Sequence, residues 1–209
     1  MMRRLLPRLT VVTLGASLVL LGGCIGGKTQ PSRFYILTAL PSSEPGKQSA
    51  EHRIAIGIGP VELPEYLNRP QIVTRANRNQ LHLAEFDQWA EPLKDNFSRV
   101  LAENLSALLS TDHVAIFPWD GSTPIDYQVA VEVTRFEGTT DGGTSLIARW
   151  SIFGKGGRGL LLRRRSGFSE PGGAKDYDAT VSAMNRTLAD LSREIAAEIK
   201  AISQKAPDH

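Results

Sequence analysis

The chain has 209 residues, of which 41% are apolar and 22% charged, a composition typical of one globular domain and unlike that of disordered or collagen-like proteins. Its formal charge of +2 comes from the first 23 residues, which contain three arginines and no acidic residue. Without them, 21 basic residues face 22 acidic ones, and a net charge near −1 argues against a nucleic-acid-binding protein.

The N-terminal segment is typical of an export signal. Its arginines precede an apolar run over residues 9–21, which is too short to span a bilayer comfortably. The next residues, LGGC at 21–24, resemble the lipobox of bacterial lipoproteins. We therefore expect residues 1–23 to be a lipoprotein signal peptide and Cys24 to become the lipidated first residue. The alternative is an ordinary signal peptide with an incidental buried cysteine.

Cys24 is the only cysteine, so its lipidation leaves no thiol for a disulfide or for catalysis. The next residue is Ile25, whereas an aspartate at this position retains bacterial lipoproteins in the inner membrane. The likeness to lipoproteins thus implies the periplasmic face of the outer membrane. Residues 24–32 form the lipidated tether, whose polar part, 26–32, spans at most about 25 Å.

Residues 33–117 are predicted to form several strands and one helix. The candidates are 33–40, then 52–63 after a proline-rich and serine-rich loop, and a hairpin of 71–75 and 79–86. A helix is predicted from Pro92, with apolar residues recurring every three or four positions as far as Leu108. A short strand is expected at 113–117.

The second half repeats this order. Residues 126–138 alternate clearly, and 145–154 and 160–168 form a predicted hairpin around a glycine-rich turn. The last helix carries a narrow apolar seam from Val181 to Ile202, and Asp176 or Asp178 can cap its start. Such a seam normally packs on a sheet of the same domain, and self-assembly through it is the alternative.

The order of four strands, a helix, four strands and a helix predicts an α/β fold. We expect a single domain over residues 33–204, with one mixed β-sheet and two long amphipathic helices packed on it. A helix between strands requires at least one parallel crossover, while the hairpins provide antiparallel pairs.

No catalytic or metal-binding pattern emerges from the residues, so the protein is predicted not to be an enzyme and to need no cofactor beyond the lipid on Cys24. GKGGRG at 154–159 matches a phosphate-binding fingerprint only in letters, because strands flank it on both sides. None of the four histidines has metal-ligand spacing, and His82 and His113 are expected at the surface. Arg163, Arg164 and Arg165 predict a solvated face, with binding of phospholipid head groups or an acidic partner as the alternative.

One segment is typical of a contact surface. Residues 59–75 contain three prolines, which favour an irregular loop, and Tyr66 and Leu67 look exposed. Trp89 stands just before the helix, where a core position is expected first and a binding surface second. The candidate partner-binding residues are Tyr66, Leu67, Arg69 and Trp89.

These segments resemble one known family. The sequence PVELPEYL at 60–67, with QIV at 71–73 and WAEPL at 89–93, is similar to the PqiC/YmbA family of ABC-type transport auxiliary lipoproteins. FYIL at 34–37, and YQV at 127–129 leading into Phe136, fit the same pattern. The resemblance covers nearly the whole chain from Cys24 to about Ile202.

The resemblance implies a fold like the N-terminal domain of TolB and a role in moving lipids between membranes. The implied partners are an MCE-domain protein and inner-membrane transporter components, with phospholipid of the outer membrane around the anchor and possible homo-oligomers. We expect the protein to dock the MCE partner at the outer membrane and so support envelope integrity. The alternative is a periplasmic carrier lipoprotein that binds a lipid or another hydrophobic ligand.

Overall fold

A computed structural model of the chain describes residues 30–41, 54–174 and 176–205. The chain divides into two compact units, Met1–Pro31 and Ser32–His209, and all the described helices and strands belong to the second. The expected signal peptide, Cys24 and most of the loop expected after residue 40 lie outside the described residues, so these expectations remain predictions.

The described elements follow the predicted order. The strands are β1 (Arg33–Tyr35), β2 (Ile56–Glu62), β3 (Gln71–Arg75), β4 (Leu81–Trp89), β5 (Val114–Ile116), β6 (Tyr127–Thr139), β7 (Gly143–Gly154) and β8 (Arg158–Pro171). The helices are α2 (Leu93–Leu109) and α3 (Tyr177–Lys205), together with the single 3-10 turns η3 (Glu65–Leu67) and η4 (Lys155–Gly157). The predicted α/β class, with a mixed sheet and two long helices, is confirmed.

β6 is the strand around which the sheet is organised. On one edge it pairs antiparallel with β7, which pairs antiparallel with β8. Its other edge is shared, because β2 pairs in parallel with the first half of β6 and β3 pairs in parallel with its end. β5 extends the sheet beyond β2, and β4 and then β1 extend it beyond β3. The parallel pairs confirm the predicted crossover.

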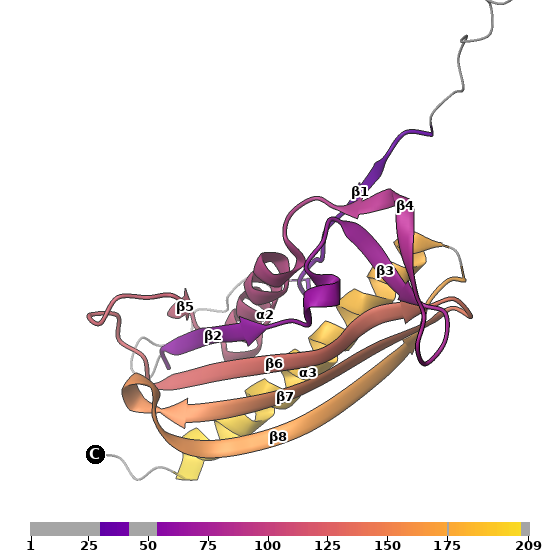
Figure 1. Cartoon of the computed structure of the whole chain (residues 1–209). Coiled ribbons are helices and arrows are strands. Elements are labelled where there is room, and N and C mark those ends of the chain that lie inside the picture. Colours follow the sequence, from indigo (N-terminus) through magenta and orange to yellow (C-terminus); the bar gives the residue numbers. More distant parts are fainter. Residues whose placement is uncertain (1–29, 42–53, 175, 206–209) are drawn as a thin grey trace, which may run out of the picture. The chain divides into compact units, whose positions relative to one another are not determined.

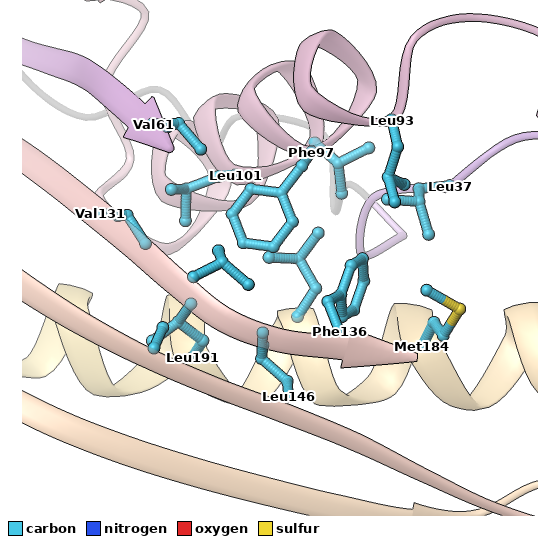
Figure 2. Close-up of a cluster of buried hydrophobic side chains, with 14 of the residues drawn as sticks. Leu37, Val61, Leu93, Phe97, Leu101, Val131, Phe136, Leu146, Met184 and Leu191 are labelled. Atoms are coloured by element: carbon cyan, nitrogen blue, oxygen red, sulfur yellow. The ribbon is translucent and has the colours of Figure 1, made fainter. Parts of the chain in front are cut away.

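Both helices lie on one face of this sheet (Figure 1). Side chains of α2 and of the inner face of β6 meet in the core, where the rings of Phe97 and Phe136 contact edge to face at a centroid distance of 5.3 Å (Figure 2). The seam of α3 is buried there too, with Met184 and Leu191 pointing toward the strands (Figure 2). The expectation that this seam packs within its own domain is therefore confirmed.

A glycine and a cap fix the start of α3. A side chain at Gly138 of β6 would come within 2.7 Å of Thr180 Cγ2, so glycine allows the helix to approach the sheet closely. Asp176 Oδ1 accepts hydrogen bonds from the backbone N–H groups of Asp178 and Ala179, at 3.0 and 3.2 Å. Of the two aspartates proposed from the sequence, Asp176 is the cap.

One strand is shorter than predicted. The strand expected over 33–40 ends at Tyr35, and the chain continues without a strand partner. The reason is that helix side chains satisfy its backbone: Asn96 accepts the N–H of Leu37, and Asn104 accepts the N–H of Leu40. The apolar pattern of this segment reflects packing against helices and not pairing in a ladder.

The cap of α3 gives a first test. Asp176→Ala should lower the free energy of unfolding by about 1 kcal/mol, because two backbone N–H groups lose their acceptor. Asp178→Ala, in the first turn of the helix, is the matched control and should have a smaller effect. Urea unfolding of both variants measures this, and equal losses would contradict the assignment of the cap.

Candidate partner-contact site

The candidate contact segment from the sequence, residues 59–75, has its ends in β2 and β3, and only residues 63–70 form the loop between them. The backbone of this loop is hydrogen-bonded at several points. Since β2 and β3 both pair with β6, both ends of the loop are fixed on the same strand. The carbonyl of Pro64 accepts the N–H of Leu67 at 2.9 Å, which closes η3. The carbonyl of Pro70 accepts the N–H of Trp89 at 2.7 Å, which joins the loop to the end of β4.

Beneath this loop lies Glu137 of β6, a carboxylate with only 1% of its surface exposed. Arg75 of β3 donates from Nε to Oε1 at 2.6 Å, and the hydroxyl of Tyr66 donates to Oε2 at 2.8 Å. The backbone N–H of Phe136 adds a bond to Oε2 at 3.1 Å, and Arg135 lies 3.6 Å from Oε1. A buried charge is tolerated only when it is paired in this way, so the cluster ties three separate segments together.

The same cluster places Tyr66 in an unusual electrostatic setting. Burial, and secondly its hydrogen bond to Glu137, raise the pKa of Tyr66 to about 12. The guanidinium of Arg75 also lies 5.8 Å from the centre of the Tyr66 ring, a cation–π contact. Tyr66 is thus a neutral hydrogen-bond donor at every physiological pH. Its contacts with Glu137 and Arg75 hold the loop against β6 and β3.

The four candidate residues from the sequence divide into two groups. Leu67 and Trp89 are 2% and 6% exposed and belong to the hydrophobic core. The first expectation for Trp89, a core position, is therefore confirmed. The expectation that Leu67 is exposed is wrong. Tyr66 and Arg69 are partly exposed. The Nε atom of Arg69 is buried without a hydrogen-bond partner among the described residues. Partner binding through these four residues stays a prediction.

The accessible surface of the segment is a shallow depression beside η3. It has a volume of about 320 Å³ and is lined by Glu62, Leu63, Glu65, Leu67, Asn68 and Lys94. Two of these side chains are acidic and one is basic, so the depression is more suited to a polar or basic group than to an acyl chain.

The sequence did not reveal Glu137 or Arg75. The alternating pattern of β6 places Val129, Val131 and Val133 on the inner face, and strict alternation would put Glu137 there too. A register shift between Val133 and Arg135 reverses the order, so that Phe136 points to the helices and Glu137 to the opposite face. A bulge of this kind leaves no clear trace in a single sequence.

A second buried acid fixes the first strand, which follows the expected tether. Asp87 of β4 is 5% exposed and receives the guanidinium of Arg33 at 2.7 Å and the hydroxyl of Tyr35 at 2.8 Å. Burial, together with the bond to Asp87, raises the pKa of Tyr35 to about 12. β1 has only three residues, so these side-chain bonds supply much of what holds it to the sheet.

Beyond β1, amide side chains hold the next residues against both helices. Asn96 of α2 bonds both backbone groups of Leu37, accepting at 2.6 Å and donating at 3.3 Å. Asn104 accepts from Leu40 and donates to Ser192 of α3, so the same side chain joins the two helices. Asn185 of α3 accepts from the backbone of Thr38 in the same manner.

The arginine run has a mixed environment. Arg164 points toward α3, where it lies 3.8 Å from Glu194 and 3.0 Å from Glu198. Arg163 and Arg165 point to the opposite face of β8, because side chains alternate along a strand, and both are exposed. The predicted solvated face is therefore present at two of the three positions. GKGGRG forms the turn between β7 and β8, as predicted.

The described residues contain no group of three or more histidine, cysteine, aspartate and glutamate side chains that could hold a metal ion. His82 and His113 are exposed, as expected from the sequence. Within the same part of the chain, no helix is both long enough and apolar enough to cross a membrane.

Comparison with known proteins identifies the family. A model of the ABC-type transport auxiliary lipoprotein component matches residues 35–196. The chain belongs to this family. The intermembrane transport lipoprotein PqiC of Escherichia coli K12 is 26% identical over 180 residues, which cover 86% of this chain and 92% of PqiC. PqiC of Shigella flexneri matches to the same extent.

Two solved structures share the fold. One is an uncharacterized protein with a TM-score of 0.64 and 22% identity, covering 81% of this chain and 99% of that one. The other, from Xanthomonas campestris, has a TM-score of 0.65 and 16% identity, covering 83% and 98%. Membership in the family makes the protein a membrane-associated lipoprotein that assists a transporter, and transport auxiliary lipoproteins are not a class of enzymes.

Removing the hydroxyl of Tyr66 tests the buried cluster. Tyr66→Phe should cost about 1.5–3 kcal/mol of unfolding free energy at neutral pH, because a bond to a buried carboxylate is lost. The control is Tyr127→Phe, whose hydroxyl makes no hydrogen bond within the described residues and whose loss should cost little.

The pH dependence of the same variants gives a further check. The pKa of Tyr66 is about 12 in the folded protein, against about 10 in an unfolded chain. Its contribution to stability is therefore complete below about pH 10 and is lost as the pH rises toward 12. Tyr66→Phe should flatten this alkaline loss, leaving the part due to Tyr35, Tyr127 and Tyr177, whose pKa values are also raised by burial. An unchanged profile between pH 10 and 12 would contradict the burial of Tyr66.

The amide contacts can be tested at Asn96. Asn96→Ala should leave the buried backbone groups of Leu37 unpaired and cost about 1–3 kcal/mol. Hydrogen exchange at the amide of Leu37 should accelerate, while amides in β6 should change only with global stability. Asn68→Ala, an exposed asparagine in the contact loop, serves as the control and should leave exchange at Leu37 unaltered.

Proposed function

We propose that this protein is the outer-membrane-anchored periplasmic subunit of an MCE-type system for lipid transport between membranes. In this role it docks the MCE partner at the outer membrane and supports envelope integrity. The observation that carries the proposal is the match of residues 35–196 to the transport auxiliary lipoproteins, together with the likeness of most of the chain to PqiC.

The mechanism we infer is positional. Acyl chains on Cys24 would hold the protein in the membrane, since two or more chains anchor stably where one binds only marginally. The tether is short, and it leads directly into β1, which Asp87 and the amides of the helices fix firmly to the domain. A domain held in this way can receive the end of a partner at a defined height above the bilayer.

The loop over residues 63–70 is the surface we propose for that partner. Its backbone is fixed by the Glu137 cluster, so little conformational entropy would be lost when it binds. Leu67 and Trp89 would act from inside, by holding the loop in place, while Tyr66 and Arg69 lie at its partly exposed side. The acidic rim formed by Glu62 and Glu65 favours a partner segment with basic or polar side chains.

The alternative of a lipid carrier receives less support. The space between the sheet and the helices is filled by fully buried side chains such as Phe97, Phe136 and Leu191 (Figure 2). An acyl chain could enter only if the helices separated from the sheet. Purified protein is therefore expected to carry no lipid beyond its covalent anchor, which native mass spectrometry can check.

Lipid attachment and sorting give the main test of the proposal. Cys24→Ala should release the protein from the outer-membrane fraction and abolish its function, while circular dichroism stays unchanged because the domain does not include this residue. Ile25→Asp is the matched variant, because it should keep the lipid but move the protein to the inner membrane.

The wild-type protein should also co-purify with an MCE-domain protein from mild detergent. Loss of this association in Tyr66→Phe, with Tyr127→Phe unaffected, would support the loop as the contact. The proposal fails if Cys24→Ala remains in the outer-membrane fraction, or if no MCE-domain protein accompanies the lipidated protein.

A further inference from the structure

The turn between β7 and β8 carries exposed apolar side chains together with unpaired positive charge. Leu160 and Leu161 are 50% and 48% exposed. They lie where the register of β8 against β7 shifts twice, so the strand leaves the regular pleat at this point. We call Lys155, Arg158, Leu160, Leu161, Arg163 and Arg165 the hairpin tip.

The charged residues of this region are all basic. Residues 142–169 contain six basic residues and no acidic one. Two of the six are neutralised, because Arg149 pairs with Glu132 at 2.7 Å and Arg164 with the two glutamates of α3. Lys155, Arg158, Arg163 and Arg165 form no ion pair with any described residue. Acidic residues among those described border the tip without forming ion pairs with it. The loop that contains Asp126 touches η4, where the N–H of Gly156 donates to the carbonyl of Ile125 at 2.9 Å. Glu62 and Glu132 line the same depression as Arg163.

The hairpin tip and β1 lie near opposite ends of β6. β3, which carries β4 and β1, joins β6 at Gly138, whereas the tip adjoins Gln128 at the other end of β6. Ten residues of strand separate these points, a distance of about 33 Å. Figure 1 shows the η4 turn and the β3–β4 hairpin at opposite ends of the sheet, while β1 pairs with residues 87–89, at the end of β4 away from that hairpin. The polar part of the tether spans at most about 25 Å. The tip can therefore touch the bilayer that holds Cys24 when β6, β7 and β8 lie parallel to the membrane plane.

We propose that the hairpin tip is a second membrane contact, which docks on anionic phospholipid head groups and orients the lipid-anchored domain. The two leucines enter the head-group region, and the four free cations pair with lipid phosphates. The inference rests on the anchoring at Cys24 in the proposed function, and adds to it a defined orientation on the membrane.

A bilayer suits this surface better than a protein partner does. A standard protein interface contains about 20–30 residues on each side and depends on shape complementarity. The tip offers only two large exposed leucines and flexible cationic side chains, which a fluid surface of phosphates can match without a complementary shape. Anchoring through Cys24 also raises the local concentration of lipid around the tip, so a weak contact is enough.

The experiment uses the lipidated full-length protein in vesicles. Because Cys24 is the only cysteine, Leu160→Cys introduces a single free thiol, which can be labelled with an environment-sensitive fluorophore. Ala107→Cys, at an exposed position of α2, is the matched control. Vesicles of phosphatidylethanolamine with phosphatidylglycerol are compared with vesicles of phosphatidylcholine, both containing a lipid-borne quencher.

The label at position 160 should be quenched in the anionic vesicles and much less in the neutral ones, while the label at position 107 stays unquenched. Arg163→Glu with Arg165→Glu should lower the ratio of docked to free tip by about tenfold or more, and raised salt should act in the same direction. Lys94→Glu with Arg78→Glu makes the same change of charge elsewhere and should have little effect.

Equal quenching at positions 160 and 107 would overturn the inference, as would quenching that survives the charge reversal. Protection of position 160 from iodide without quenching by lipid would also overturn it, by indicating a protein contact such as a second copy of the chain. Labelling of the protein without an added cysteine would mean that Cys24 is not lipidated, which is a failure of the proposed function and not of the tip.

Discussion

The shared edge of β6 is the constraint on which the rest of the molecule depends. Two strands pair in parallel with that one edge, so the chain must leave it after β2 and return to it at β3. The connecting loop, residues 63–70, places Tyr66 against Glu137 of β6, whose side chain is buried there. Once buried, that carboxylate requires Arg75 and Tyr66, and their bonds in turn fix the loop. Topology and electrostatics thus produce a rigid surface from a segment rich in proline.

The N-terminal side of the domain follows a similar logic with different chemistry. A three-residue strand has too few backbone bonds to hold on its own, and Asp87 adds an ion pair and a hydrogen bond. The residues beyond it gain their hydrogen bonds from asparagines on two helices, which act as substitutes for a neighbouring strand. A protein held by its N-terminus needs this junction to be firm, because the domain can be positioned only as well as its first residues are fixed. A firm junction of this kind is what the proposed positional role requires.

The order of elements could be read from the sequence because it depends on local periodicity. The seam of α3 and the alternation of β6 predicted both elements, and Asp176 was one of two caps expected for the helix. The length of β1 could not be read in this way, because an apolar segment held by Asn96 and Asn104 has the same pattern as a strand. Leu67 was wrongly expected at the surface, and Trp89 was ambiguous, for a related reason: a large apolar side chain near a loop can serve a core or an interface, and only packing decides between them.

The sequence alone predicts the lipobox around Cys24, and it was enough to infer the mixed α/β class and the family, because each rests on short motifs or on repeating patterns along the chain. The place of Glu137 at the centre of the candidate site became visible only in three dimensions, since its burial follows from a bulge in β6 and from a loop distant in sequence. The same holds for the charge of the hairpin tip. Arg164 looks identical to its two neighbours in the sequence, but glutamates of α3 neutralise it. Arg163 and Arg165 have no ion pair among the described residues, because alternate residues of a strand face opposite sides of the sheet.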